Sequence, residues 1–278
     1  MGKAGVKGFL DPPGVMRICR FESEAFHELP YWAGPLGGGP ALRLPFHRAA
    51  VEGLPDGLAA IVVTSDLQGV VCARTGTAVP LGEAVGEQLN LLQERGALPT
   101  PERTATLLAG DLHPRAGEAD VCGIWKAIRK SCRWIAGVGG NHDVFGTEPM
   151  AAGVLGALER ERCWVLDEQI VTVDRMRIGG ICGAVGDGHG TWERPESAFA
   201  KAVERLAQQR PDMLVMHDGP NVAGTAFAGW PSIRRAVEGA PPTLVIRGHD
   251  HWDSPLQLLV NGTQVLNVEG RVVVLERM

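Results

Sequence analysis

Five short apolar runs, each followed within a few residues by side chains that can bind a metal ion, restrict the fold of this chain more than any other feature. The runs are residues 58–63, 105–109, 134–138, 213–216 and 243–246. They are short and aliphatic, and each ends abruptly at Gly, Asp, Asn or His, which is typical of buried strands. The sequence therefore predicts a sheet at the centre of the fold.

Three amphipathic segments accompany these runs and are predicted to be helices: residues 81–94, 120–133 and 195–209. In the first of them, apolar side chains recur at the spacing of one helix face, at Leu81, Val85, Leu89 and Leu92. Strands that alternate with helices form largely parallel sheets covered by helices, so an α/β fold is expected. Two apolar stretches without a helix, residues 164–181 and 256–276, predict hairpins.

Gly and Pro are concentrated before residue 58, where turns and short extended pieces are expected. We therefore divide the chain into an N-terminal elaboration, residues 1–57, and a main domain, residues 58–278, on which the elaboration packs. A length of 278 residues lies within the range of one large α/β domain.

Composition restricts the class of substrate. The chain is 45% hydrophobic and 21% charged, and its formal charge of -5 with a pI near 5.9 disfavours nucleic acid as a partner. A small substrate is expected instead. The six cysteines follow no metal-binding or disulfide spacing, which indicates reduced thiols and a cytoplasmic location. Nowhere do about 18 apolar residues run together, so no membrane association is expected.

The polar residues that follow the five strands can be brought together by such a fold. Loops beyond the carboxyl ends of parallel strands meet at one crevice, and Asp, Asn, Gln and His offer oxygen and nitrogen ligands for a metal ion. Turn formation gives no reason for all five strand ends to carry such residues. In chain order they are Asp66 and Gln68, Asp111, Asn141 and His142, His217, and His249 and His251.

This ordered set resembles the motifs of the calcineurin-like metallophosphoesterase superfamily. The matching segments are Ser65-Asp66-Leu67-Gln68, Gly110-Asp111, Gly139-Gly140-Asn141-His142-Asp143, His217 and Gly248-His249-Asp250-His251. The resemblance implies a four-layer α-β-β-α sandwich of two mixed β-sheets. It also implies hydrolysis of a phosphomonoester, a phosphodiester or a nucleotide anhydride by in-line attack of a hydroxide that bridges two divalent metal ions.

The resemblance further implies a role for each side chain. One metal ion is expected to be bound by Asp66, Gln68 and His251. The other is expected to be bound by Asn141, His217 and His249, with Asp111 shared between the two. Mn suits this mixed ligand set best, with Fe, Zn, Mg, Ni or Co as alternatives. Asp111 and His142 are the expected catalytic residues, His142 as the general acid that protonates the leaving oxygen.

Gln68 departs from the superfamily pattern, which usually has His at this position. An amide oxygen is a harder, neutral and weaker ligand than imidazole, so the first metal ion is expected to be held less tightly. Gln here is similar to the ADP-ribose and CDP-alcohol diphosphatase branch, which favours a substrate linked to a nucleoside diphosphate.

A second departure lies in the segment 110–115. Protein serine/threonine phosphatases have Gly-Asp-x-x-Asp-Arg there, in which the second Asp orients the general acid and the Arg binds phosphate. Arg115 matches, but Pro114 replaces that Asp, so protein phosphatase activity is disfavoured. His142 then needs another partner, for which the candidates are Asp143, His113 and Asp250.

Several residues are expected to contact the substrate, namely Arg115, Asn141 and, in a Gly-rich loop, His189. For Arg247, just before Gly248-His249, two interpretations stay open: it contacts phosphate, or it pairs with a neighbouring carboxylate.

Two other functions compete with hydrolysis of a small phosphorylated substrate. Gln68 and Pro114 are compatible with a metal-binding or regulatory module of the same fold that has lost turnover. A nuclease acting in nucleic-acid processing would use the same metal site, but it needs a basic groove lined by aromatic residues.

Overall fold

The five apolar runs that precede the predicted ligands are all strands. A computed structural model describes residues 16–34, 39–72, 77–114, 119–146, 152–188 and 190–278. The runs form β4 (Ala60–Thr64), β7 (Thr104–Ala109), β9 (Ile135–Val138), β16 (Met213–Met216) and β17 (Leu244–Arg247), and every residue in them is buried. Strands that are covered on both faces need no alternation of polar and apolar residues.

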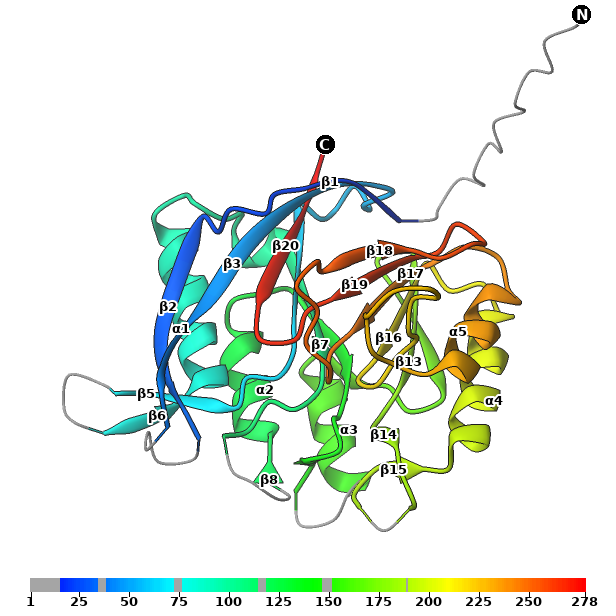
Figure 1. The fold of residues 1–278 in the computed structure, drawn as a ribbon. Coiled ribbons are helices and arrows are strands. Elements are labelled where there is room, and N and C mark those ends of the chain that lie inside the picture. The colour runs from blue at the N-terminus through cyan, green and yellow to red at the C-terminus, as the bar shows by residue number, and fades with distance from the viewer. Residues whose placement is uncertain (1–15, 35–38, 73–76, 115–118, 147–151, 189) are drawn as a thin grey trace, which may run out of the picture.

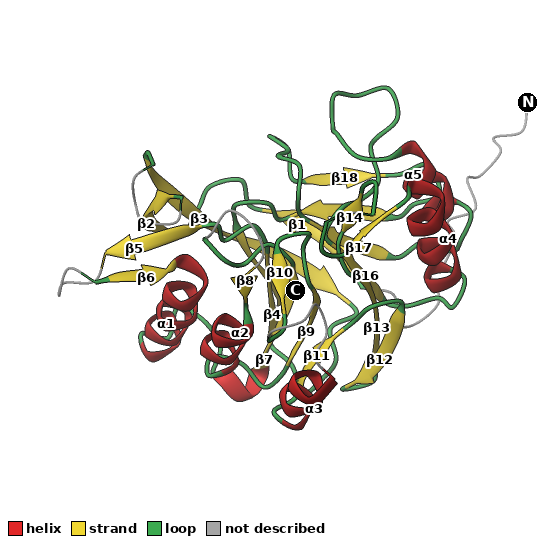
Figure 2. Ribbon diagram, turned by 90° about the horizontal axis from the view of Figure 1, so that it is seen from below, coloured by secondary structure: helices red, strands yellow, loops and turns green. Residues whose placement is uncertain are grey.

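The larger sheet holds ten strands, including β4, β7 and β9. Strand β7 is labelled in Figure 1, and all three strands are labelled in Figure 2. The others are β1 (Arg17–Phe21), β2 (His27–Ala33), β3 (Ala41–Glu52), β5 (Gly69–Cys72), β6 (Ala78–Pro80), β11 (Cys163–Val165) and β20 (Val272–Arg277). The order is β11-β9-β7-β4-β20-β3-β2-β5-β6, and β1 pairs with β3. The first four are parallel, whereas β20 is antiparallel to β4 and parallel to β3.

The smaller sheet holds β16 and β17 among six strands. The other four are β12 (Gln169–Val173), β13 (Met176–Ile181), β18 (Leu256–Leu258) and β19 (Gln264–Asn267), in the order β12-β13-β16-β17-β19-β18. The central four are parallel and both edges are antiparallel. The predicted hairpin in residues 164–181 is confirmed, and its turn residues Asp174 and Arg175 have φ of 47° and 68°. In residues 256–276 only β18 and β19 form a hairpin, since β20 joins the larger sheet.

Helices cover the outer faces of both sheets (Figure 2). On the larger sheet lie α1 (Leu81–Glu94), α2 (Cys122–Arg129) and α3 (Ala152–Arg160), and on the smaller sheet lie α4 (Glu196–Ala207) and α5 (Pro231–Glu238). Three apolar cores separate the layers: one between the two sheets, one beneath α1 to α3, and one beneath α4 and α5. The expected α-β-β-α sandwich of mixed sheets is therefore confirmed.

The predicted helices are found, although α2 is shorter than expected at both ends. The bounds of α1 are those predicted, and its apolar positions Leu81, Val85, Leu89 and Leu92 are buried. Helix α2 begins two residues later than predicted because Asp120 belongs to β8 (Ala119–Asp120) and accepts a hydrogen bond from the backbone N–H of Cys122 at 3.0 Å. Helix α4 lies within the predicted range, with Pro195 just before it.

Residues 17–52 contribute more regular structure than expected. Instead of turns and short extended pieces, they form β1, β2 and the twelve-residue β3, which joins the larger sheet beside β20. The division at residue 57 stays a prediction.

Short elements complete the description. They are a 3₁₀ turn (Pro101–Arg103), the pair of β8 with β10 (Asp143–Val144), and the pair of β14 (Ala184–Val185) with β15 (Glu193–Arg194). Within the described residues, no helix combines the length and the apolar character needed to cross a bilayer.

Candidate metal centre

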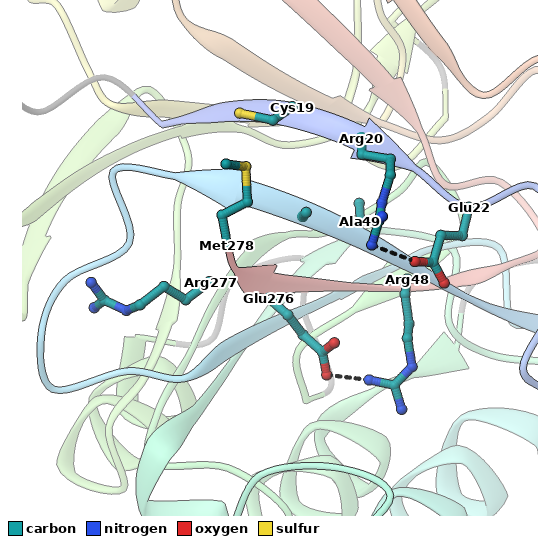
Figure 3. A pocket seen from close by; sticks show the side chains of 9 residues that line it. Cys19, Arg20, Glu22, Arg48, Ala49, Glu276, Arg277 and Met278 are labelled. Atoms are coloured by element: carbon teal, nitrogen blue, oxygen red, sulfur yellow. Dashed lines mark hydrogen bonds and ion pairs between the residues drawn. The ribbon is translucent and has the colours of Figure 1, made fainter.

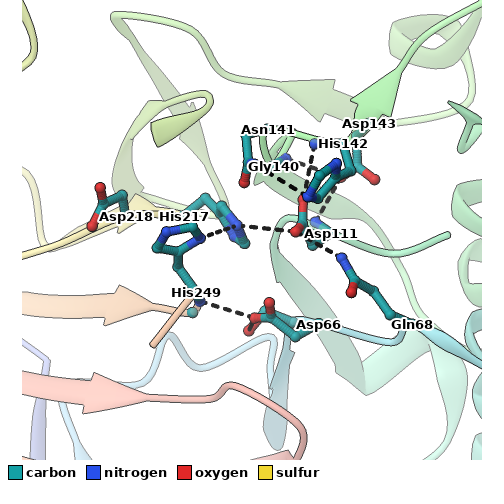
Figure 4. Close-up of polar contacts among 12 residues, drawn as sticks. Asp66, Gln68, Asp111, Gly140, Asn141, His142, Asp143, His217, Asp218 and His249 are labelled. Atoms are coloured by element: carbon teal, nitrogen blue, oxygen red, sulfur yellow. Dashed lines mark hydrogen bonds and ion pairs between the residues drawn. The ribbon is translucent and has the colours of Figure 1, made fainter. Parts of the chain in front are cut away.

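The loops after five central strands bring predicted ligands to one place (Figure 4). Asp66 follows β4, Asp111 follows β7 and Asn141 follows β9 in the larger sheet. His217 follows β16 and His249 follows β17 in the smaller sheet. These side chains therefore lie where the carboxyl ends of parallel strands from both sheets meet.

Unusual backbone conformations turn these side chains toward one another. Asp66, Asp111 and His249 have φ of 55°, 54° and 71°, in the left-handed region that non-glycine residues seldom adopt. The backbone N–H of Asp66 donates to the carbonyl of Gly110 at 2.9 Å, which joins the first two loops. Strained conformations of this kind are concentrated at functional sites.

Asp111 lies at the centre of the group. Its Oδ2 accepts a hydrogen bond from Nε2 of Gln68 at 2.8 Å and lies 3.4 Å from Nε2 of His217, and its Oδ1 accepts from the backbone N–H of His142 at 3.2 Å. Potential ligand atoms of Asp66, Asp111 and His217 all lie within 4.8 Å of one another. Such a group has the geometry to share one or more cations.

His217 is fixed so that one ring nitrogen faces this group. Its Nδ1 lies 2.8 Å from the carbonyl of Ala109, to which it donates, and its Nε2 lies 3.2 Å from Nδ1 of His249. A ligand histidine is commonly held in this way, because the bond to one nitrogen sets the orientation of the other.

The charges in the group shift one another's pKa. Burial alone lowers the pKa of His217, but Asp111 and Asp66 outweigh it and raise that pKa to about 10. Burial raises the pKa of Asp66 to about 6, opposed by His217 and supported by Asp111. Burial also acts to raise the pKa of Asp111, yet attraction to His217 and His142 leaves it lowered. Without a metal ion, a protonated imidazole thus supplies the positive charge that the carboxylates require.

Two glycines leave room for the carboxylates. A Cβ at Gly140 would lie 1.9 Å from Oδ1 of Asp111, and a Cβ at Gly248 would lie 2.4 Å from Oδ2 of Asp66. Both distances are far below van der Waals contact, so any larger residue would displace a predicted ligand.

The side-chain oxygen of Asn141 tests whether these residues suit a metal cation. Its Oδ1 is buried, and none of the described residues donates a hydrogen bond to it. A buried acceptor left unpaired costs about 1–3 kcal/mol, and amide oxygens are accepted ligands of divalent cations. The mixture of carboxylate, imidazole and amide oxygen therefore fits the divalent metal ions that the sequence predicted.

Asp143 organises the site. It is completely buried and accepts backbone N–H groups of Asp111 at 2.8 Å, Leu112 at 3.0 Å and Gly140 at 2.9 Å. Sequence reasoning named it only as a candidate partner of His142, and its position directly after the Asn-His pair was the available signal. Because both oxygens bind backbone, Asp143 fixes the loops that carry Asp111 and Asn141.

Other predicted residues lie apart from this group or cannot be placed. His251 is exposed, with Nδ1 2.6 Å from Oε2 of Glu269 and Nε2 3.6 Å from Oδ1 of Asp253. Its metal-binding role stays a prediction. Arg115 and His189 lie outside the described residues. Arg247 is buried and pairs with Asp250 at 2.8 Å, which favours the second of its two interpretations.

Several solved structures are similar to this chain at low sequence identity. A structure whose protein is not named superposes with a TM-score of 0.52 and 12% identity, covering 80% of this chain and 95% of the other. A hypothetical protein from Thermus thermophilus gives 0.45 and 16%, covering 76% of each chain. The phosphopantetheinyl hydrolase of Mycobacterium tuberculosis gives 0.46 and 13%, covering 77% and 90%. Only the first likeness, with its TM-score above 0.5, bears on the fold, and at 12% identity it bears on the fold alone.

A family model identifies the chain more directly. No curated protein matches it significantly. The model of the calcineurin-like phosphoesterases matches residues 59–253, which include every predicted metal ligand. The chain therefore belongs to the calcineurin-like phosphoesterase family and is a phosphoester hydrolase.

Proposed function

We propose that this chain hydrolyses a small phosphorylated substrate, either a phosphomonoester, a phosphodiester or a nucleotide anhydride, at a centre of two divalent metal ions. The observation that carries the proposal is the convergence of Asp66, Asp111 and His217 within 4.8 Å, beside the unpaired buried oxygen of Asn141. Family membership supports metal-dependent phosphoester hydrolysis, and the substrate and the metal ions are the parts that we add.

The ligand sets follow the sequence prediction. Asp66, Gln68 and His251 would hold one ion, Asn141, His217 and His249 the other, and Asp111 both. When bound, the ions would activate water and neutralise charge on the phosphoryl oxygens. Mn is the expected metal, because oxygen ligands outnumber imidazoles in the part of the site that is already assembled.

The chain's own residues position the substrate and move protons. Asn141 presents its amide oxygen at the centre, and His142 follows it with its backbone N–H bonded to Asp111. We assign to His142 the protonation of the leaving oxygen. Its ring Nε2 lies 3.3 Å from Nδ2 of Asn141. Arg115, Asn141 and His189 are proposed to contact the phosphate.

Acidic side chains around the centre favour a small substrate over nucleic acid. Asp250, Asp253 and Glu269 all lie on the loops around His249 and His251, and such charge would repel a long polyanion. Gln68 supports a substrate of the nucleoside-diphosphate type, as in the diphosphatase branch. All six cysteines are free thiols, which supports a cytoplasmic location.

One experiment tests the chemistry and the substrate class together. Purified protein is stripped of metal and reloaded with Mn, Mg, Fe, Zn, Ni or Co in turn. It is then assayed with phosphomonoesters, cyclic nucleotides, nucleoside diphosphate derivatives and short DNA. We expect turnover with Mn and a small substrate, and we expect Asp111→Asn to abolish it. Metal binding without turnover of any substrate would support the regulatory module instead, and a preference for DNA would support the nuclease.

A further inference from the structure

Arg247 is a completely buried arginine that joins both sides of the His249 loop. Its Nε donates to the carbonyl of Gly248 at 2.9 Å, and one Nη donates to Asp250 at 2.8 Å. The other Nη donates to the carbonyl of Ala228 at 2.8 Å, and the guanidinium lies 5.1 Å from the ring centroid of Trp252. The backbone that carries His249 is therefore held immediately before and after that residue.

Asp218 holds the neighbouring loop in a similar way. It directly follows His217, is 1% exposed, and lies 3.9 Å from the guanidinium of Arg247. Its Oδ2 accepts from the backbone N–H of Val185 at 3.1 Å and from Nε1 of Trp230 at 2.6 Å. Its Oδ1 accepts from the backbone N–H of Gly219 at 2.8 Å.

We propose that Asp218 and Arg247 are positioning residues that set the placement of His217 relative to His249. The inference rests on the proposed function, because it concerns two of the proposed ligands. The imidazoles lie 3.2 Å apart between facing nitrogens, and each belongs to a loop held by one member of this charged pair. Apolar residues would fill the same space at no desolvation cost, whereas charged groups with several partners fix loops by strong, directed hydrogen bonds.

The packing around Arg247 leaves it little freedom to move. A Cβ at Gly219 would lie 2.8 Å from Cδ and 3.0 Å from Nε of Arg247. Gly219→Ala is therefore a probe that displaces the guanidinium without removing any charge.

The test compares Arg247→Lys, Asp218→Asn and Gly219→Ala with a matched control, Arg48→Lys. Arg48 is a partly buried arginine that pairs with Glu276 and donates to the carbonyl of Ala97 at 2.6 Å. It lines a pocket between β1, β3 and β20 that contains none of the predicted ligands (Figure 3). Lysine keeps the charge in both cases but loses the planar fork that binds several acceptors.

Binding of Mn²⁺ is measured by calorimetry and by electron paramagnetic resonance, below the unfolding temperature of each variant. We expect the three variants near the centre to bind at least one Mn²⁺ about tenfold more weakly, with a changed spectrum of the bound ions, since residues that support ligands contribute about 10–100-fold. The control should bind within about twofold of wild type. The Arg247→Lys/Asp218→Asn double variant should lose less than the product of the two single losses, because the pair acts as a unit.

Folded variants that bind both ions with wild-type affinity and spectrum would overturn the inference and leave the proposed function standing. If the two charge variants do not fold, Gly219→Ala alone decides by the same criterion. A wild-type protein that binds no divalent ion would overturn the proposed function itself.

Discussion

The side-chain amide of Gln68 donates a hydrogen bond from Nε2 to Oδ2 of Asp111 over 2.8 Å. In this arrangement the nitrogen of the amide faces the carboxylate that both metal ions are proposed to share. An amide nitrogen offers no lone pair to a cation, so Gln68 must present its oxygen, and give up this hydrogen bond, when it binds metal. That cost adds to the weakness of an amide ligand.

Replacing Gln68 by His should therefore strengthen metal binding. Imidazole suits Zn better than an amide oxygen does, and we expect the weaker of the two dissociation constants for Zn²⁺ to fall about tenfold, or about 1.4 kcal/mol. Calorimetric titration of metal-free protein with Zn²⁺ checks this. Gln68→Ala is the control, for which binding should weaken. Equal affinity in all three proteins would show that Gln68 is not a ligand.

Asn141→Ala should separate stability from metal binding. The substitution removes a buried oxygen that none of the described residues satisfies, so the metal-free variant should be as stable as wild type or up to about 1 kcal/mol more stable. The stabilisation that Mn²⁺ gives to wild type should be largely lost. Denaturant unfolding with and without Mn²⁺ measures both effects. A metal-free variant that is clearly less stable, with the stabilisation by Mn²⁺ intact, would contradict a ligand role.

The sequence predicted those parts of the fold that depend on local patterns of apolar residues. Five buried strands show as unbroken apolar runs, and α1 shows as a regular apolar stripe, because each pattern lies within one segment. The strand β3 was not predicted, because Pro45 and His47 interrupt its pattern and its partner β20 lies more than 200 residues later in the chain. Helix α5 was missed because it is short and buries only Ile233 and Val237.

The same distinction applies to the candidate site: the residues that follow strands could be predicted, and the contacts of their side chains could not. Asp66, Asp111, Asn141, His217 and His249 were predicted because each follows a strand, and strand ends meet in this topology. The orientation of a side chain depends instead on contacts between distant segments. That is why the exposed position of His251 beside Glu269, and the buried contacts of Asp143, Asp218 and Arg247, were found only in the structure.

The pH dependence of stability should reverse when metal is bound. The pKa of His217 is raised from 6.5 to about 10, and that of Asp66 from 3.8 to about 6. Both are raised, so these two groups bind more protons in the folded metal-free protein than in the unfolded chain, and the stability that they contribute falls as pH rises from about 4 to about 10. Metal displaces these protons, so its affinity should increase with pH by up to about tenfold per unit for each proton released.

Thermal unfolding between pH 6 and pH 9, with Mn²⁺ and with chelator, checks both trends. Calorimetry in buffers of different ionisation enthalpy should detect at least one proton released as metal binds. An affinity that does not change with pH would mean that His217 is already neutral or does not bind the ion.

Gly140→Ala should destroy the centre. The added Cβ would lie 1.9 Å from Oδ1 of Asp111 and 2.5 Å from its backbone nitrogen, so Asp111 must move. We expect kcat/KM to fall more than about 100-fold, since even a supporting residue costs about 10–100-fold. We also expect the free energy of unfolding to fall by about 1–3 kcal/mol.

Gly156→Ala is the control for Gly140→Ala. It lies in α3, where the nearest atom to its Cβ is 3.8 Å away, and helix propensity predicts a gain of up to about 1 kcal/mol. Wild-type kinetics in Gly140→Ala would contradict this structure of the site.

His142→Ala should affect substrates according to their leaving group. Alanine keeps the backbone N–H that reaches Asp111 at 3.2 Å, so metal binding should be retained, and metal analysis of the variant checks this. An alkyl phosphate leaves as a poor alkoxide that needs a proton, and we expect its kcat to fall about 10²–10⁴-fold. A p-nitrophenyl ester leaves as a stable anion, so its kcat should fall less than about tenfold, because no proton is needed in the transition state. The ratio of the two losses therefore reports proton donation separately from any disturbance of the metal ions, which would slow both substrates alike. Equal losses, with metal content intact, would exclude His142 as the general acid.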